Sequence, residues 1–190
     1  MKYIIEHTEN KIYDWCCIEY KHISKLVGRN NLIFTNINNK NDFVKLKNIG
    51  EVKKESILKL NFKNICLLDP SCEKELNPED CEKFDYFLFG GILGDYPPRE
   101  RTANYFKNLK AKRRNLTKEQ MPTDVAVLAV KLISEGNKIE NLKFKDKPVI
   151  NIKKGRFNEE IILPYRYIML YDKLIISKEL IKYLKSKKDL

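Results

Sequence analysis

Short apolar runs alternate with segments of helical spacing over residues 1–136, and this alternation restricts the fold more than any other feature. The runs expected to be strands cover residues 2–7, 31–36, 65–70 and 85–91, with a weaker one at 111–116. The helical segments cover residues 11–27, part of 40–62, 77–84, a stretch from Pro98 onward, and 122–136. Strands that are apolar on both faces are typical of a parallel sheet covered by helices. The sequence therefore predicts an α/β fold with a mainly parallel sheet flanked by helices.

The pattern changes beyond residue 140. Residues 143–154, 159–170 and 173–177 are typical of antiparallel strands, and residues 177–188 predict a basic final helix. No repeat, low-complexity linker or obvious boundary interrupts the chain. We therefore expect a single domain over residues 1–190.

The composition is that of a soluble globular protein, with 43% hydrophobic and 33% charged residues. No apolar run is long enough to span a membrane, and the opening MKYIIEH is too short in apolar residues for a secretory signal. We therefore expect a cytoplasmic protein without a membrane partner. The net charge of +11 favours an anionic partner such as RNA or a ribosomal particle. A lysine-rich surface without such a partner explains the charge equally well.

The cysteines and histidines limit the chemistry. The chain has five cysteines, an odd number, and no C-x-x-C spacing, so we expect reduced thiols and no metal site. Any site of the Ser-His-Asp or Cys-His kind has to use His7 or His22, the two histidines of the chain.

Three glycines lie in the segment DYFLFGGILGDYPPRERT at residues 85–102. The spacing of Gly90, Gly91 and Gly94 matches neither the dinucleotide fingerprint nor the P-loop. Glycine is favoured where the backbone takes a positive φ or approaches a ligand closely. Two apolar residues lie between Gly91 and Gly94. This favours a flat aromatic ligand held by backbone amides, and the adenine of S-adenosylmethionine fits that description. A tight turn without a ligand is the alternative.

A second candidate segment, residues 116–124, is a polar loop that enters a helix of small and apolar residues. Small residues at a helix start let the helix lie close to a ligand. Thr123 or Asp124 is expected to cap this helix, with free backbone amides pointing into the site. An ordinary capped helix is the alternative.

Together these segments resemble one branch of the SPOUT, or α/β-knot, methyltransferases. The resemblance covers nearly the whole chain in order, and it rests on residues 3–7, 66–70, 85–102, 120–121, 123–124 and 163–167. The branch includes a fungal enzyme that methylates an arginine of a small-subunit ribosomal protein. The resemblance implies a parallel α/β sheet whose C-terminal region forms a deep trefoil knot, with S-adenosylmethionine bound in a bent form in the knot.

The resemblance also implies a cofactor pocket built from three loops. Its residues are Leu68, Asp69, Phe89, Gly90, Gly91, Gly94, Leu116, Gln120, Met121 and Thr123. Pro122 departs from the family pattern, in which we expect a threonine. Proline is well tolerated in the first turn of a helix, so this departure does little harm.

An arginine acceptor requires carboxylates near the transferred methyl group. Its guanidinium has a pKa above about 12, so acids must hold it and draw off its charge. The candidates are Asp95 and Glu6, as guanidinium clamps or base, followed by Glu100 and the more distant Glu19. For Asp95, a cap of the following helix is the alternative.

Arg101 is a further catalytic candidate, because in many SPOUT enzymes an arginine contacts the acceptor. It can also pair with Glu100 or with the cofactor carboxylate, and a solvated surface arginine is the alternative. His7 ends a predicted strand and either orients a carboxylate or is purely structural.

The sequence therefore predicts an S-adenosylmethionine-dependent methyltransferase that N-methylates an arginine of a ribosomal protein. An rRNA or tRNA methyltransferase of the SPOUT class is the first alternative, since the net charge of +11 suits RNA. A non-enzymatic RNA-binding or ribosome-assembly factor is the second. The oligomeric state, monomer or homodimer, stays open.

Overall fold

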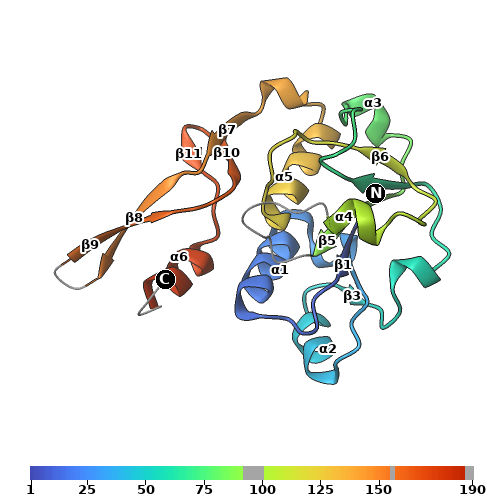
Figure 1. Ribbon diagram of the computed structural model, residues 1–190, viewed down its shortest axis with the longest axis horizontal. Coiled ribbons are helices and arrows are strands. Elements are labelled where there is room, and N and C mark those ends of the chain that lie inside the picture. Colours follow the sequence, from blue (N-terminus) through green and yellow to red (C-terminus); the bar gives the residue numbers. More distant parts are fainter. Residues whose placement is uncertain (92–100, 155–156, 187–190) are drawn as a thin grey trace.

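The computed structural model describes residues 1–91, 101–154 and 157–186, and its elements are shown in Figure 1. The helices are α1 (Asp14–Val27), α2 (Lys40–Leu46), α3 (Pro78–Cys81), α4 (Arg101–Tyr105), α5 (Thr123–Ser134) and α6 (Lys178–Ser186). The strands are β1 (Lys2–His7), β2 (Leu32–Thr35), β3 (Glu51–Val52), β4 (Ile65–Leu68), β5 (Tyr86–Gly91), β6 (Lys112–Arg114), β7 (Lys143–Asp146), β8 (Val149–Lys154), β9 (Phe157–Ile162), β10 (Arg166–Leu170) and β11 (Lys173–Leu174). Short 3-10 turns cover Arg29–Asn31, Ile57–Lys59 and Ile139–Asn141.

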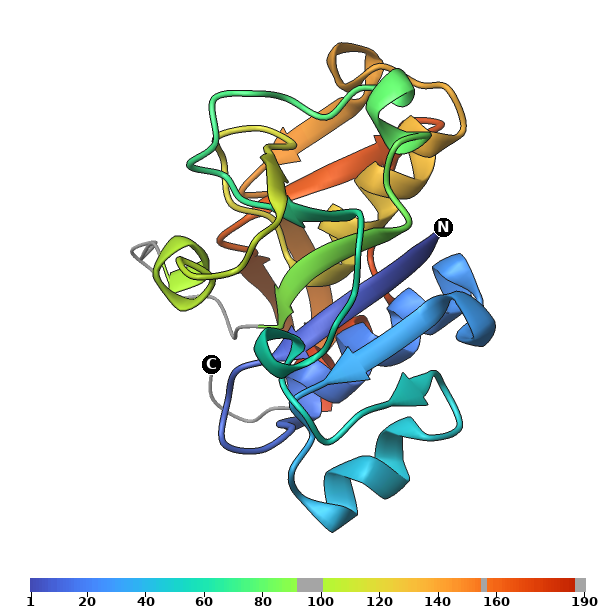
Figure 2. The same cartoon turned by 90° about the vertical axis from the view of Figure 1, so that its right-hand side faces the viewer.

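The first six strands form one sheet in the order β3-β2-β1-β5-β4-β6, and all the paired neighbours are parallel. Strand β1 lies between β2 and β5, in dark blue in Figure 2, with Ile5 beside both Phe34 and Phe89. The predicted parallel α/β sheet is thus confirmed. The pattern did not predict β3, a two-residue edge strand within a segment expected to be helix and loop.

The sheet is apolar on both faces, as its sequence predicted. Successive residues of a strand point to opposite faces. Ile4 and Leu88 pack with Phe106, which follows α4, whereas Ile5 and Phe89 belong to the cluster that contains α1 and α5. Whether a residue at a strand end can reach α1 and α5 therefore depends on which face of the sheet its side chain points to.

Helix α1 buries one stripe, made of Cys16, Tyr20, Ile23 and Val27. These residues recur at three- and four-residue spacing, so they share one face of the helix. The helix begins at Asp14, three residues later than expected, and ends at Gly28 with φ +80°. A positive φ is easy for glycine, which explains the stop at this position.

Helix α5 begins one residue later than expected. Pro122 precedes the first turn, with φ −58° and ψ 153°, and supplies no side-chain cap. The expectation that Thr123 or Asp124 caps the helix is therefore wrong, because both already lie inside it. The Asp124 carboxylate instead accepts a hydrogen bond from the Val125 amide and contacts His22.

The C-terminal strands are antiparallel, as predicted, and lie beyond α1 and α5 from the main sheet (Figure 1). They form a three-stranded sheet, β11-β10-β7, and a hairpin of β8 and β9. The predicted strand over 143–154 is two strands, separated at Lys147, which has φ +43°. Helix α6 packs on α1 through an edge contact of Trp15 with Tyr183 and an ion pair of Lys25 with Glu179.

No helix within the described part of the chain is long and apolar enough to cross a membrane. The trefoil knot and the single-domain organisation stay predictions.

Candidate active site

The carboxyl ends of the parallel strands bring the predicted cofactor residues of two neighbouring strands to one edge. Leu68 ends β4 and is followed by Asp69, while Phe89, Gly90 and Gly91 end β5, which pairs with β4. Ligands of open parallel sheets bind at such edges. Gly94 and Asp95 lie outside the described residues. Arg101 is the first residue of α4, and its side chain is likewise outside the description.

Gly91 is a glycine because the protein itself fills the space beside it. A Cβ at this position would collide with Tyr20 Oη and would lie 2.9 Å from Ile5 Cγ2. The space that a side chain at position 91 would fill is therefore taken by Tyr20 and Ile5, and not by a ligand. Contact of the Gly91 backbone with a cofactor stays a prediction.

His7 supports the tyrosine under Gly91. Its Nδ1 lies 2.9 Å from Tyr20 Oη, and its side chain is buried, with no described residue as a hydrogen-bond partner of Nε2. Burial lowers the pKa of His7, against smaller opposing contributions that begin with the Lys11 backbone. Burial favours the neutral imidazole, and its contact with the buried Tyr20 hydroxyl indicates a structural role for His7.

Glu6 is completely buried, on the face of the sheet covered by α4. Its Oε2 accepts hydrogen bonds from Thr35 Oγ1 at 2.5 Å and from the Ile57 amide at 3.0 Å. Its Oε1 accepts from Ser56 Oγ at 2.5 Å and from Tyr105 Oη at 2.8 Å. A carboxylate has about four lone-pair sites, and here four donors fill them. The geometry thus argues against the predicted role of Glu6 as a guanidinium clamp or base.

Asp69 organises the loop that follows β4. Its Oδ1 accepts from the Ser71 amide and hydroxyl at 3.0 and 2.7 Å, and its Oδ2 accepts from Arg113 Nη1 at 2.9 Å. The side chain is therefore committed to the protein, and the backbone of this loop is what remains for a cofactor.

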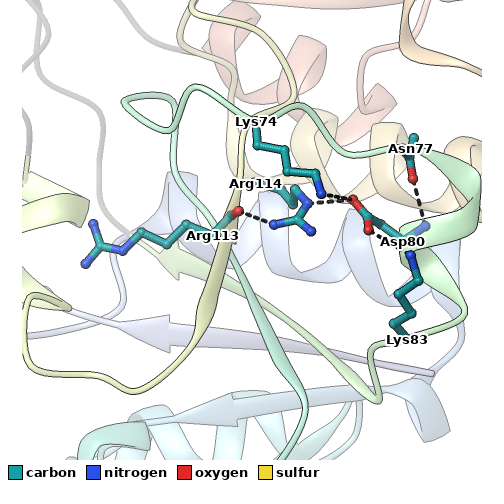
Figure 3. Close-up of polar contacts among 6 residues, drawn as sticks. All are labelled: Lys74, Asn77, Asp80, Lys83, Arg113 and Arg114. Carbon is teal, nitrogen blue, oxygen red and sulfur yellow. Dashed lines mark hydrogen bonds and ion pairs between the residues drawn. The ribbon is translucent and has the colours of Figure 1, made fainter.

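A buried ion pair ties the same loop to β6 (Figure 3). Arg114 Nε donates to Asp80 Oδ2 at 2.6 Å, and Arg114 Nη1 donates to the Arg113 carbonyl at 2.7 Å. The Asn77 side chain caps α3 by accepting from the Asp80 amide at 2.7 Å. The hydrogen bond from Arg114 lowers the pKa of Asp80. Asn115, the first residue after β6, also accepts from the Leu76 amide and donates to the Lys74 carbonyl, both at 2.9 Å, so the segments that follow β4 and β6 are held together.

The loop from β6 to α5 carries Leu116, Gln120 and Met121. Leu116 is buried and Met121 is half-buried. The Gln120 carbonyl accepts from the Arg166 amide of β10 at 3.0 Å, so the C-terminal sheet holds this loop. The Gln120 side-chain oxygen Oε1 is buried, and within the described part of the chain it has no hydrogen-bond partner.

A polar cluster lies between α1, α5 and β10, and sequence reasoning did not bring its residues together. Trp15 Nε1 donates to Glu19 Oε1 at 2.6 Å, and His22 Nδ1 lies 2.6 Å from Asp124 Oδ2. Tyr167 is 1% exposed, and its hydroxyl has no hydrogen-bond partner among the described residues. Burial, and then the charge of Asp124, raise the pKa of Glu19 to about 8. We call these five residues the α1–α5 cluster.

The sequence held a signal for this cluster. Trp15, Glu19 and His22 are spaced by four and three residues, so they share one face of a helix. From the sequence, Glu19 is only a more distant acceptor candidate, and nothing in the pattern connects it with Asp124 or Tyr167. Their partners in α5 and β10 lie more than a hundred residues away, beyond the reach of a periodicity argument.

Comparison with known proteins decides the family. A family model described as "Protein arginine N-methyltransferase SFM1-like" matches residues 2–190. The chain belongs to the SFM1-like family. A curated relative, protein arginine N-methyltransferase SFM1 of Saccharomyces cerevisiae, is 39% identical over 189 residues, covering 89% of this chain and 86% of its own.

Solved structures agree with this SFM1-like assignment. Yeast SFM1 complexed with SAH superposes with a TM-score of 0.83 at 34% identity, covering 97% of this chain and 94% of its own. The complex of yeast SFM1 with SAM gives the same TM-score and identity, with 89% of that chain covered. The dual-specific Trm10 of Thermococcus kodakaraensis reaches a TM-score of 0.57 at 19% identity, covering 74% of this chain and 96% of its own, and indicates a shared fold alone. The predicted resemblance to the SPOUT arginine methyltransferases is confirmed.

The loops of this SFM1-like chain fit S-adenosylmethionine. Leu68, Leu116 and Met121, which we predict to line the adenosyl group, are apolar, and each is buried or half-buried. The buried, unpartnered Gln120 Oε1 is an acceptor for N–H groups, which the cofactor carries on its adenine and on its amino-acid end. The individual cofactor contacts stay predictions.

Proposed function

We propose that this protein N-methylates an arginine of a ribosomal protein, with S-adenosylmethionine as the methyl donor. The observation that carries the proposal is the match over residues 2–190 to a family of protein arginine N-methyltransferases, together with 39% identity to a curated member. Relatives solved with SAM and SAH support the choice of methyl donor.

The chemistry assigns tasks to the residues of this chain. When bound, S-adenosylmethionine supplies a methyl group on a positively charged sulfur. We expect the loops after β4 and β6 to hold it together with the glycine segment, and the pairs Asp69–Arg113 and Asp80–Arg114 tie the chain that follows β4 to strand β6. Acidic side chains must hold the guanidinium and accept its proton, because arginine is otherwise always protonated. Positioning of the two reactants supplies much of the remaining acceleration.

The ribosomal part of the proposal rests on charge. The chain has 37 lysines and arginines against 26 aspartates and glutamates, a net charge of +11. Such an excess attracts a protein to an RNA-coated particle and raises its rate of encounter. A cationic enzyme surface and an arginine acceptor are compatible if the arginine is presented by a protein of that particle.

A labelling experiment tests the proposal. The protein is incubated with tritiated S-adenosylmethionine and, in parallel, with ribosomal subunits, with separated ribosomal proteins and with protein-free rRNA and tRNA. We expect label in one ribosomal protein, recovered as methylarginine after hydrolysis. Label in RNA would support the RNA methyltransferase alternative. No label, together with no calorimetric binding at millimolar cofactor, would support the non-enzymatic alternative.

A further inference from the structure

We propose that Glu19 and Asp124 bind the guanidinium of the acceptor arginine, that Tyr167 supplies a third contact, and that Glu19 takes the proton the guanidinium loses. This inference rests on the proposed arginine acceptor. It moves the acceptor site away from Glu6, whose carboxylate is filled by four protein donors.

Glu19 and Asp124 lie beside the predicted cofactor loop. Asp124 is the second residue of α5, which directly follows the loop of Gln120 and Met121. Glu19 lies on the facing helix, close enough to Asp124 and Thr123 for both to shift its pKa. The carboxylates are thus next to the loop that we expect to hold the methyl donor.

The charges of Glu19 and Asp124 also support the proposal. Two partly or fully buried carboxylates lie near each other, and among the described residues neither forms an ion pair with a lysine or arginine, although His22 lies 2.6 Å from Asp124. The chain has 37 lysines and arginines, so a cationic partner could easily have been supplied internally. Repulsion from Asp124 adds to burial in raising the pKa of Glu19 to about 8. A bound cation would relieve both effects.

The buried hydroxyl of Tyr167 has no hydrogen-bond partner among the described residues. Its side chain is 1% exposed, and buried polar groups nearly always have a partner. After burial, the charges of Asp124 and Glu19 are the largest causes that raise the pKa of Tyr167, so the phenol faces the same two acids. A guanidinium carries five N–H donors in a planar fork, enough for two carboxylates and a phenol oxygen. A lysine ammonium has three donors and lacks that planar geometry.

The reaction balances with these groups. The guanidinium binds as a cation, and one of its N–H protons passes to the Glu19 carboxylate. The nitrogen then forms a bond to the methyl carbon as the bond from that carbon to sulfur breaks, and the electron pair of the broken bond stays on sulfur. The proton on Glu19 leaves to solvent, which restores the carboxylate for the next turnover.

Trp15 is the single tryptophan of the chain and donates to Glu19, so its fluorescence reports on this site. The wild-type protein is titrated with an acetyl-arginine amide and, as a control ligand, with acetyl-lysine amide. We expect a saturable change in Trp15 emission with arginine and a much weaker one with lysine. Equal responses to both ligands, or none to arginine, would overturn the proposal.

Kinetics of two variants complete the test. Glu19→Gln should retain S-adenosylmethionine binding but lose at least about 100-fold in methylation rate, the range expected for a general base. Tyr167→Phe removes only an unpartnered oxygen, so it should fold and raise KM for the acceptor about tenfold with little change in kcat. The matched control Glu179→Gln, on the exposed side of α6, should behave as wild type.

The outcomes separate this inference from the proposed function. Wild-type rates in Glu19→Gln, with methylarginine still formed, would refute the inference and leave the arginine methyltransferase standing. A wild-type protein that labels RNA would refute the proposed function itself. If circular dichroism shows that Glu19→Gln does not fold, Tyr167→Phe and the Trp15 titration decide, and a wild-type KM in Tyr167→Phe would count against the site.

Discussion

Replacing Gly91 by alanine tests whether this glycine serves packing or a ligand. The new methyl group would collide with Tyr20 Oη, lie 2.9 Å from Ile5 Cγ2 and lie 3.1 Å from the Glu6 carbonyl. Overpacking of a core typically costs about 1–3 kcal/mol. Because one neighbour is backbone of the central strand β1, we expect a value near the middle of that range, about 2 kcal/mol. For a chain of this length that lowers Tm by about 4–8 °C.

A double-mutant cycle with Tyr20→Phe identifies the colliding atom. Tyr20→Phe alone should cost about 1 kcal/mol, because His7 Nδ1 loses its hydrogen-bond partner. In the double variant the colliding oxygen is gone, so the total loss should be about 1 kcal/mol less than the sum of the single losses. Urea unfolding and calorimetric binding of S-adenosylmethionine are measured on all four proteins. If Gly91→Ala keeps the wild-type Tm and loses cofactor binding, the packing argument is refuted.

Three further predictions concern buried charges. Glu6→Gln should destabilise the fold by about 3 kcal/mol in urea unfolding, because an amide presents N–H groups to existing donors; unchanged stability would contradict the donor count. Arg114→Met should lower the free energy of unfolding by about 3 kcal/mol, because it leaves Asp80 without its closest cation, and it should weaken cofactor binding. The control Lys83→Met removes an exposed ion pair with Asp80 and should cost under about 1 kcal/mol. The KM for the arginine acceptor should fall as the pH rises through about 8, because Glu19 becomes ionised there. The titratable groups that face Glu19 are Asp124, His22 and Tyr167. A KM that does not change with pH would contradict this assignment.

The Glu19 pKa also predicts how stability changes with pH. Its folded-state pKa is raised above the ordinary carboxyl value of 4.5 to about 8, so the folded protein holds this proton more tightly than the unfolded chain. The contribution of Glu19 to stability is therefore complete below about pH 4.5 and is lost as the pH rises toward 8. Comparing urea unfolding of wild type and Glu19→Gln across this window isolates the effect. Parallel curves would show that burial does not hold the proton.

The parallel sheet could be predicted from sequence because its strands are apolar on both faces. Ile4 and Ile5 are adjacent in the sequence, and each is fully buried on a different face. Strand β3 could not be predicted in the same way, since Glu51 is exposed and Val52 is half-buried on a sheet edge. The break between β7 and β8 depends on a positive φ at Lys147, which residue type alone does not indicate.

The cofactor residues of the candidate site stay predictions, while the contacts of Glu6 argue against its predicted place in the acceptor site. Leu68, Phe89 and Leu116 occur at strand ends and in the following loops, where sequence pattern and sheet topology agree. Glu6 occupies an equally suggestive strand end. Its orientation, however, depends on which face of the sheet receives α4, and that choice is made by tertiary packing. No local pattern distinguishes a carboxylate that faces α4 from one that faces α1.

What distinguishes the two glutamates is the set of partners that surrounds each of them. Among the described side chains no cation forms an ion pair with Glu6, but four donors satisfy its two oxygens, so its charge is stabilised with nothing further bound. Trp15 and Thr123 form hydrogen bonds with Glu19, but burial and the charge of a second carboxylate, Asp124, outweigh them and raise its pKa, which favours its neutral form. Only the second arrangement improves when a guanidinium binds. An acid that is poorly stabilised without substrate is therefore the better candidate to bind the acceptor arginine.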